Sequence, residues 1–342
     1  MKKNIIALAV ASAIAAPVAM ADAPTVYGKL NQALESVSEN GIQVNSRASR
    51  LGVKGSSDLG NGLKAVYKVE FSVGMADGSA IGNRNQYAGL AGGFGTVLMG
   101  RHDTPMKMIQ SKDLFNDSHY GDDRRFNGGI GYLNRSGEVR ANNVLAYVSP
   151  SFGGVKLIAA GVTEAQDNAT AGTTNKDSSL TNVMSFAAAY GSKKKGLYLA
   201  AAYNTFDKKT GVDGSETRVT AQYVVAGLLA NVSYNNADLK RTPGSSVAFT
   251  KASTISANIG YKMGNLMPKV KFATIDYDKT VQSKDSTSMA VGVDYKLGKK
   301  TTTYAEYLTV DKYNRQGANF NSTTIANGKS TDVISVGLIH KF

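Results

Sequence analysis

The stretch Leu63–Phe71 reads LKAVYKVEF, and its side chains alternate between apolar and charged. The odd-numbered positions are all apolar, whereas Lys64, Lys68 and Glu70 lie on the opposite face of an extended chain. A period of two is typical of a β-strand that has one dry face and one wet face. This stretch therefore predicts a strand at the boundary between an apolar phase and water.

Similar but less regular alternation recurs along the chain, at 44–55, 197–206, 217–224, 291–297 and 301–310. Helical periodicity is weak nearly everywhere. No run of eighteen apolar residues follows residue 21, so the sequence contains no candidate for a helical membrane span there. The pattern predicts an all-β protein.

Short turns alternate with longer polar loops between the expected strands. The short turns are expected at 57–62, 92–95, 150–154, 191–196, 226–227, 263–265 and 298–300. The longer loops are expected at 38–41, 74–83, 104–139, 163–181, 207–215, 240–249, 278–285 and 312–330. Seven turns and eight loops divide the chain into sixteen strands. Short turns at one rim and long loops at the other are typical of a transmembrane antiparallel β-barrel, with short periplasmic turns and long extracellular loops.

The sheet must close on itself if it spans a bilayer. In lipid every backbone N–H and C=O needs a partner, and an open sheet has two unpaired edges. We expect the first strand, around 26–37, to pair with the last, around 332–342. A barrel of sixteen strands is too wide for side chains to fill, so its polar faces would line water.

The N-terminus has the features of a cleaved export signal. Lys2 and Lys3 precede an apolar run at 5–18, and Ala19-Met20-Ala21 gives the small-x-small pattern of a cleavage site. The alternative, an N-terminal membrane anchor, is disfavoured because the run is too short to span a bilayer comfortably. We expect residues 1–21 to be removed and 22–342 to form a single domain.

Composition narrows the range of partners. The chain has no cysteine, 36 glycines and 17 tyrosines, which favours many strands and tight turns held by burial and hydrogen bonds. Its formal charge is +13, and removal of Lys2 and Lys3 leaves +11. This charge favours anionic partners: nucleic acid, acidic lipid or anionic solutes. Because an exported chain rarely meets nucleic acid, we expect no nucleic-acid partner.

Four segments resemble the Gram-negative general diffusion porins. They are SRLGVKGSSDLGNGLKA at 49–65, NRNQYAGL followed by GGFGTV and GR between 83 and 101, VLAYVSPSFGG at 144–154, and the terminal strand at 336–342. In the terminal strand Phe342 ends an alternating segment, which resembles the assembly signal of outer-membrane barrels. The resemblance spans the mature chain, and its specific motifs concentrate in the first half.

The resemblance implies a homotrimer of sixteen-stranded barrels, each with its own pore. It implies that the third long loop, here 104–139, folds into that pore and narrows it. This loop carries four acids that the family would place opposite basic residues of the wall: Asp113, Asp117, Asp122 and Asp123. We also expect a short helical turn at 109–115.

Basic residues of the expected strands are candidates for the pore lining. Arg50 and Arg101 match the wall arginines of the family, and Arg140 is a third candidate. Parity with their apolar neighbours directs further basic side chains to the lumen: Lys54, Lys64, Lys68 and Arg84. Arg101 departs from this rule, because it shares its parity with Met99, and a bulge near Gly100 would be needed to turn it inward.

The resemblance implies an outer-membrane channel for passive diffusion of small hydrophilic solutes and ions. Clustered Arg and Lys at a pore favour anions. Outer-membrane lipid and lipopolysaccharide are the expected surroundings. The alternatives are a substrate-specific channel, disfavoured because the chain has no tryptophan for an aromatic track, or an adhesin that uses the same barrel.

Catalysis is not expected. The chain has three histidines, His102, His119 and His340, none in a Gly-x-Ser-x-Gly setting. His102 beside Asp103 suits a polar lining better than a catalytic pair. We expect no cofactor and no metal centre, although Asp-rich loops would allow weak calcium binding.

Overall fold

The computed structural model describes most of the chain: residues 23–38, 41–76, 78, 81–115, 117–118, 122, 139–163, 179–207, 212–241, 250–278, 285–311 and 330–342. The predicted export signal at 1–21, Asp123 and His119 lie outside the described residues.

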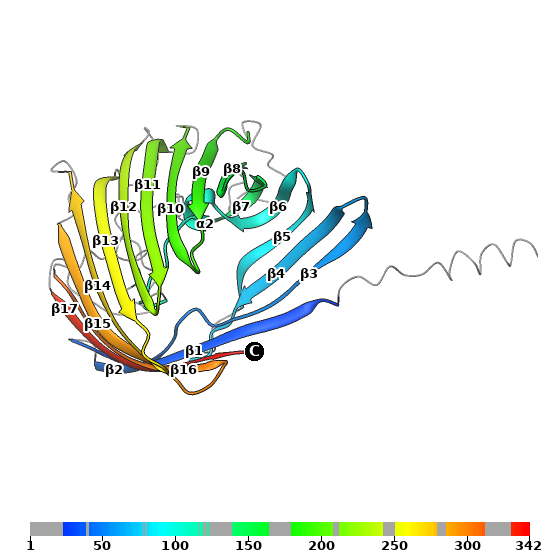
Figure 1. Ribbon diagram of the computed structural model, residues 1–342. Coiled ribbons are helices and arrows are strands. Elements are labelled where there is room, and N and C mark those ends of the chain that lie inside the picture. Colours follow the sequence, from blue (N-terminus) through cyan, green and yellow to red (C-terminus); the bar gives the residue numbers. More distant parts are fainter. Residues whose placement is uncertain are drawn as a thin grey trace, which may run out of the picture.

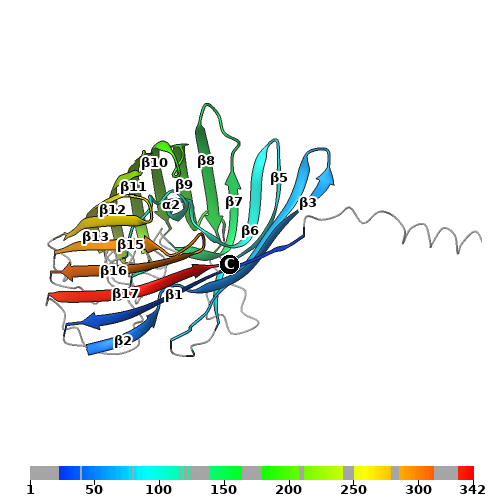
Figure 2. The same ribbon diagram turned by 60° about the horizontal axis from the view of Figure 1, so that its bottom comes forward.

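The described residues form one antiparallel sheet that closes into a barrel (Figures 1 and 2). The strands are β1 (Thr25–Val37), β2 (Gly41–Ser46), β3 (Arg50–Gly60), β4 (Leu63–Ser72), β5 (Gly82–Gly92), β6 (Gly95–Asp103), β7 (Arg140–Val148), β8 (Val155–Val162), β9 (Val183–Gly191), β10 (Gly196–Phe206), β11 (Val212–Val225), β12 (Leu228–Arg241), β13 (Thr250–Tyr261), β14 (Leu266–Tyr277), β15 (Ser286–Lys296), β16 (Thr301–Val310) and β17 (Thr331–Lys341). From β3 to β17 each strand pairs with the next in the chain, and β1 pairs with β17 from Lys29↔Lys341 to Val37↔Val333. The expected closure between the first and last strands is confirmed.

Seventeen segments make sixteen barrel strands, because β2 and β3 are two parts of one strand. β1 pairs with β2 along its second half and with β3 along its first half. Three residues, Arg47, Ala48 and Ser49, interrupt this strand, and Ala48 has a φ of +51°. The sequence predicts one continuous strand at 44–55, and this local prediction is wrong.

Connection lengths agree with the predicted alternation. Ala226 and Gly227 join β11 to β12 with φ of +46° and +89°, as a two-residue turn of the mirror-image type requires. Two connections are exceptions on the other rim: residues 38–40 separate β1 from β2, and residues 207–211 separate β10 from β11, which is no longer than the connection 149–154 between β7 and β8. The expected loop at 207–215 is too long, because β11 begins at Val212.

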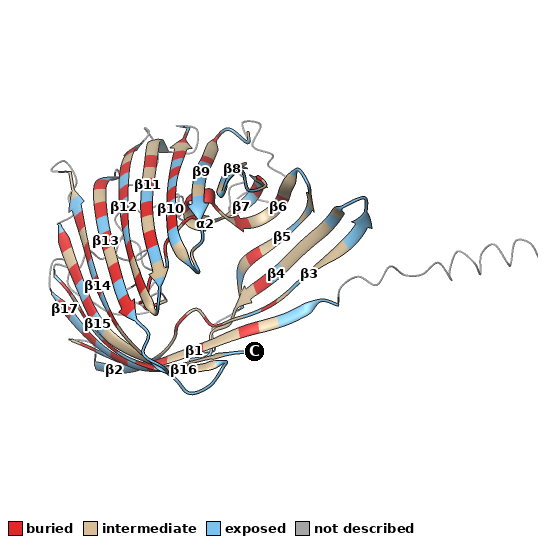
Figure 3. Ribbon diagram, viewed as in Figure 1, coloured by how far each residue is buried: buried red, intermediate tan, exposed pale blue. Residues whose placement is uncertain are grey.

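Burial alternates along the strands (Figure 3). On β14, Val270 and Phe272 are 47% and 41% exposed, whereas Ala273 and Ile275 are buried. Because alternate side chains of a strand point to opposite faces, the exposed apolar residues form the outer face of the barrel. In the part of the chain that is described, no helix has the length and apolar character needed to cross a bilayer.

One short helix, α2 (Pro105–Met108), interrupts the third loop. The expected turn at 109–115 is therefore misplaced. Thr104 precedes the helix and Pro105 begins it, which is a favourable start because Pro has no N–H to leave unpaired.

Candidate functional site

The third loop enters the barrel and runs along the inside of its wall. Thr104 Oγ1 accepts a hydrogen bond of 3.4 Å from the backbone N–H of Lys107 and so caps α2. The helix lies against β8, β9 and β10, and Figures 1 and 2 show it within the ring of strands. The loop therefore occupies part of the lumen.

Wall amides bind the loop backbone on three successive strands. Gln222 Oε1 on β11 accepts from the backbone N–H of Lys112 at 2.7 Å, and Asn231 Nδ2 on β12 donates to the Lys112 carbonyl at 2.7 Å. Asn258 Oδ1 on β13 accepts from the backbone N–H of Leu114 at 3.2 Å. These bonds satisfy backbone groups that an irregular segment would otherwise bury without partners.

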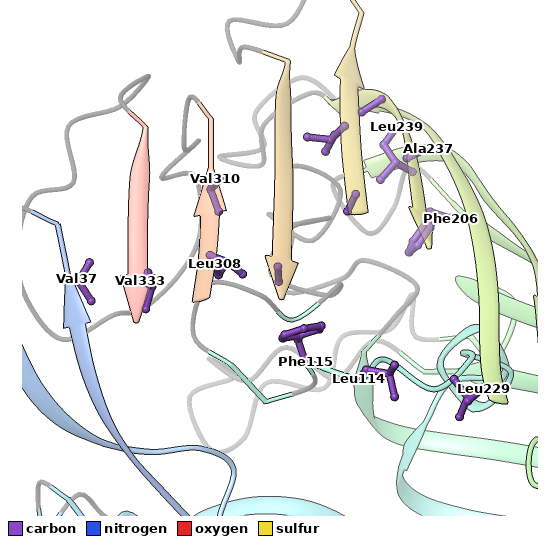
Figure 4. Close-up of a cluster of buried hydrophobic side chains, with 14 residues drawn as sticks. Val37, Leu114, Phe115, Phe206, Leu229, Ala237, Leu239, Leu308, Val310 and Val333 are labelled. Atoms are coloured by element: carbon purple, nitrogen blue, oxygen red, sulfur yellow. The ribbon is translucent and has the colours of Figure 1, made fainter. Parts of the chain in front are cut away.

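Apolar side chains of the loop pack on the same wall. Met106 and Ile109 are buried in a cluster that includes Tyr198. Leu114 and Phe115 join a second cluster, and Figure 4 shows Leu114 near Leu229 of β12. Burial of these four side chains removes apolar surface from water and favours a loop that stays against the wall.

Two lysines of β14 also hold the loop. Lys271 Nζ lies 3.0 Å from Asp113 Oδ2, and both side chains are buried. Lys269 Nζ donates to the Leu114 carbonyl at 2.9 Å and lies 4.7 Å from the centroid of the Phe115 ring. Among the described residues, Asp113 thus pairs with a lysine of the barrel wall, as expected for an acid of this loop.

Beyond Phe115 the loop reaches the opposite arc of the barrel. Asp117 forms an ion pair with Lys29 of β1, and Arg50 Nη2 of β3 lies 3.6 Å from Asp117 Oδ2. The backbone N–H of Asp117 donates to Asp122 Oδ2 at 3.3 Å, and Asp122 is buried. A loop acid and a wall arginine therefore meet directly.

Glu70 gathers a second group of charges on the same arc. Its carboxylate lies 2.6 Å from Arg84 Nε and 3.1 Å from Lys68 Nζ, and it accepts from the Tyr27 hydroxyl at 2.7 Å. The register of β4 and β5 shifts at this point, so that Arg84 and Asn85 together oppose Glu70. Of the two residues at this bulge, Arg84 binds Glu70, whereas Asn85 binds Asp103 and Arg140.

Arg140 lies at the entrance of the third loop. Its Nη2 is 3.2 Å from Asp103 Oδ1, and its Nε donates to Asn85 Oδ1. Asn85 Nδ2 in turn donates to Asp103 Oδ2 at 2.9 Å, and Lys107 Nζ lies 3.9 Å from the same carboxylate. Asp103 therefore has two cations close to it.

Lys54 and Lys64 are both exposed. Lys54 Nζ lies 5.4 Å from the centroid of the Tyr27 ring, and Lys68 Nζ lies 5.7 Å from it. Cations at this distance are attracted to the negative face of an aromatic ring. Tyr27 thus links Lys54 to the group around Glu70, whereas Lys64 follows the short turn at the rim.

Arg101 is placed differently from the other candidates. Its Nη1 donates to Asn142 Oδ1 on β7. The expected irregularity is present, because the register of β6 and β7 shifts between Gly100 and His102, and Gly100 has a φ of +132°. The extra residue belongs to β7, where Asn142 and Asn143 oppose Arg101. Among the described residues, the hydrogen-bond partner of Arg101 is thus an amide and not a loop acid.

Sequence reasoning missed three wall lysines that contact the loop, Lys29, Lys269 and Lys271. It also missed Glu306, which pairs with Lys269, and Arg47, which pairs with Glu306. Lys269 and Lys271 alternate with Val270 and Phe272, so the parity rule applied to Lys64 and Lys68 would have directed them inward. Lys29 alternates in the same way with Gly28 and Leu30. Their partners on the third loop are 88 to 158 residues away along the chain, and no local pattern identifies those partners.

His102 is buried, and its Nδ1 lies 2.7 Å from the Asp103 carbonyl. Its ring meets Tyr87 edge to face, with centroids 4.9 Å apart. Within the described part of the chain, no three His, Asp or Glu side chains gather as a metal site would require. The site consists of charged side chains where the third loop meets the barrel wall.

A family model described as "Gram-negative porin" matches residues 7–315. The chain is 29% identical to the major outer membrane protein P.IB of Neisseria meningitidis serogroup B, and the alignment covers 100% of both chains. It is 26% identical to P.IB of Neisseria gonorrhoeae over 88% of this chain and 91% of that protein.

Solved structures share the fold. The anion-selective porin from Comamonas acidovorans aligns with a TM-score of 0.78 at 22% identity, over 94% of this chain and 99% of that one. The trimer form of OmpT from Vibrio cholerae aligns with a TM-score of 0.66 at 20% identity, over 94% and 100% of the two chains.

Proposed function

The chain belongs to the Gram-negative porin family, and from that premise we propose that its water-filled channel prefers anions. It is an outer-membrane porin with a closed sixteen-stranded barrel, and porins are channels for diffusion. We propose which ions the channel favours, which residues decide this preference, and how the subunits assemble.

The observation that carries the proposal is the charge of one arc of the lumen. We call this group the basic wall cluster; its members are Lys29, Arg50, Lys54, Lys68 and Arg84, with Glu70, Asp117 and Asp122. Among the described residues, five cations face three carboxylates there, which gives a net charge of +2. Arg140 and Lys107 around Asp103 add an excess of the same sign.

A net positive arc beside a narrow aqueous path raises the local concentration of anions. The surrounding wall and lipid have a low dielectric constant and focus the field into the water. The acids of the third loop oppose this effect, but Asp113 is neutralised in a buried pair with Lys271. The fold is shared with a porin whose structure is described as anion-selective, and we propose the same preference here.

We propose a homotrimer in which β1 to β6 form the subunit interface. Tyrosine and phenylalanine are enriched at lipid headgroups in membrane barrels. On the described strands, aromatic side chains more than about a third exposed occur only between β7 and β16; they are Tyr147, Phe186, Tyr190, Tyr203, Tyr223, Tyr234, Tyr261, Phe272, Tyr295 and Tyr307. The outer face of β1 to β6 exposes aromatic side chains less: Tyr67 and Phe71 are only partly exposed there, and Phe342 covers Gly28. Such a face suits another protein surface better than headgroups. Structural relatives include a trimer form.

Further assignments belong to the same proposal. Residues 1–21 are an export signal, and 22–342 are the mature domain. Lipid and lipopolysaccharide surround the exposed faces, small hydrophilic solutes are the cargo, and the chain has no catalytic role.

Planar bilayer recording under a KCl gradient tests the ion preference. We expect current steps in groups of three and a reversal potential of the sign that chloride permeation gives. A reversal potential of the potassium sign would overturn the anion preference while leaving the channel intact. Absence of conductance from folded protein would overturn the channel itself.

A further inference from the structure

The ammonium group of Lys269, on the wall strand β14, has three acceptors around it. Its ammonium group lies 2.9 Å from the Leu114 carbonyl, 2.7 Å from Glu306 Oε1 and 2.8 Å from Asp294 Oδ1. The side chain is only 3% exposed. An ammonium group has three hydrogens, so these three acceptors satisfy it completely, and one of them belongs to the third loop.

Glu306 connects this lysine to the interruption between β2 and β3. Arg47 Nη1 donates to Glu306 Oε2 at 2.7 Å, Arg47 Nε donates to Glu35 Oε1 at 2.6 Å, and Arg47 Nη2 donates to Ser335 Oγ at 2.6 Å. Arg47 is buried. The strand break therefore directs a guanidinium group into the wall, where it fixes the carboxylate that holds Lys269.

The loop is held at three consecutive residues. Asp113 pairs with Lys271, the Leu114 carbonyl accepts from Lys269, and the Phe115 ring faces the Lys269 ammonium. Two residues later Asp117 reaches Lys29 and Arg50 on the opposite arc. The loop therefore crosses the lumen to the opposite arc directly after residues 113–115, which β14 holds in place.

We propose that Lys269, supported by Glu306 and Arg47, is a positioning residue that fixes the third loop against β14 and thereby sets the open width of the channel. The inference rests on the proposed channel function. Loss of the ammonium removes the hydrogen bond to Leu114 and the attraction to Phe115 together. The Asp113–Lys271 pair, the bond from the Leu114 N–H to Asn258 and the apolar packing of Leu114 and Phe115 then hold the segment more weakly, and a voltage that acts on its charges can move it into the lumen.

Lys269→Met tests the proposal, because it keeps the length of the side chain and removes its charge. In bilayer recordings we expect closure at a smaller applied voltage and a noisier open current than in the parent. Lys251→Met is the matched control: Lys251 lies on the adjacent strand β13, is exposed, and pairs with Asp278 at 3.6 Å. Unchanged closing voltage and noise in folded Lys269→Met would overturn the proposal.

A spin label on the loop gives a second readout that does not depend on conduction. The chain has no cysteine, so Lys112→Cys supplies a single labelling site on the loop. We expect the label to be more mobile when Lys269→Met is added, and equal mobility in both backgrounds would contradict the inference. This measurement separates the two claims, because it reports on the loop even if the parent protein fails to conduct.

Glu306→Gln covers the case in which Lys269→Met does not fold. It keeps the shape of the side chain and an acceptor oxygen for Lys269, but removes the charge that orients the ammonium. We expect a shift of closing voltage and label mobility in the same direction and of smaller size. A purely structural role would lower the thermal stability of this variant and leave both readouts at the parent values.

Discussion

Gly28 and Phe342 exchange two backbone hydrogen bonds at the seam where the barrel closes. The N–H of Gly28 donates to the carbonyl of Phe342 at 3.1 Å, and the N–H of Phe342 donates to the carbonyl of Gly28 at 3.2 Å. The aromatic ring covers Gly28 so closely that a Cβ atom there would lie 2.2 Å from it. The last residue of the chain is therefore part of the barrel wall, whether or not it also serves as an assembly signal.

Replacement of Gly28 by leucine should destabilise this seam. The new side chain would displace the Phe342 ring, and overpacking of this kind costs about 1–3 kcal/mol. We expect a lower urea midpoint for Gly28→Leu than for the parent. Gly298→Leu is the control, since a Cβ at Gly298 meets nothing within 4 Å. Equal midpoints for the two variants would contradict this account of the seam.

Neutralising Asp117 should strengthen the anion preference. Its carboxylate pairs with Lys29 and lies 3.6 Å from Arg50, so Asp117→Asn leaves two cations without this counter-charge. The reversal potential under a KCl gradient should shift in the chloride direction. Asp276→Asn, at an exposed position of β14, changes the total charge equally and should leave the potential near the parent value. A shift of the same size in both variants would show that total charge decides selectivity, not this pair.

Removal of Arg50 should have the opposite effect and should depend on salt. Arg50→Gln lowers the charge of the basic wall cluster, so the reversal potential should move in the potassium direction. The Debye length is about 10 Å at 0.1 M salt and about 3 Å at 1 M, so the shift should shrink as salt increases. Reversal potentials at both concentrations measure this. A shift that persists at high salt would point to a change of pore width.

Alternation in the sequence predicted the strands well because burial on one face decides the register of a barrel strand. It failed at Arg47, where the strand is broken so that one guanidinium can bind Glu35 and Glu306. No period of two can indicate such a break. Only the structure shows that these carboxylates, 12 and 259 residues away, meet there.

Part of the candidate site was also predictable from the alternation of side chains along the strands. Parity assigned Lys68 and Arg84 to the lumen, and both reach Glu70. The helix was misplaced to 109–115 because the backbone of that segment bonds to wall side chains such as Gln222 and Asn258 instead of to itself. Thr104-Pro105 is the better indication of where the helix begins, since Thr is a favourable N-cap and Pro a favourable first residue of a helix.

The proposed subunit interface makes a prediction about contact with lipid. Val69 on β4 and Val232 on β12 are both on the outer face, with exposures of 42% and 46% in the single chain. Each becomes a unique labelling site as Val69→Cys or Val232→Cys, because the chain has no cysteine. A fluorophore at 232 should be quenched by brominated lipid, whereas one at 69 should be protected by the neighbouring subunit.

Dissociation of the oligomer supplies the control for this comparison. A fluorophore at 69 should become open to quenching when the subunits are separated as folded monomers, and one at 232 should not change. Strong quenching at both positions in the intact protein would exclude β4 from the interface. Protection at 69 that survives dissociation would mean that the barrel itself shields this position, and the low exposure of aromatic side chains on β1 to β6 would then need another explanation.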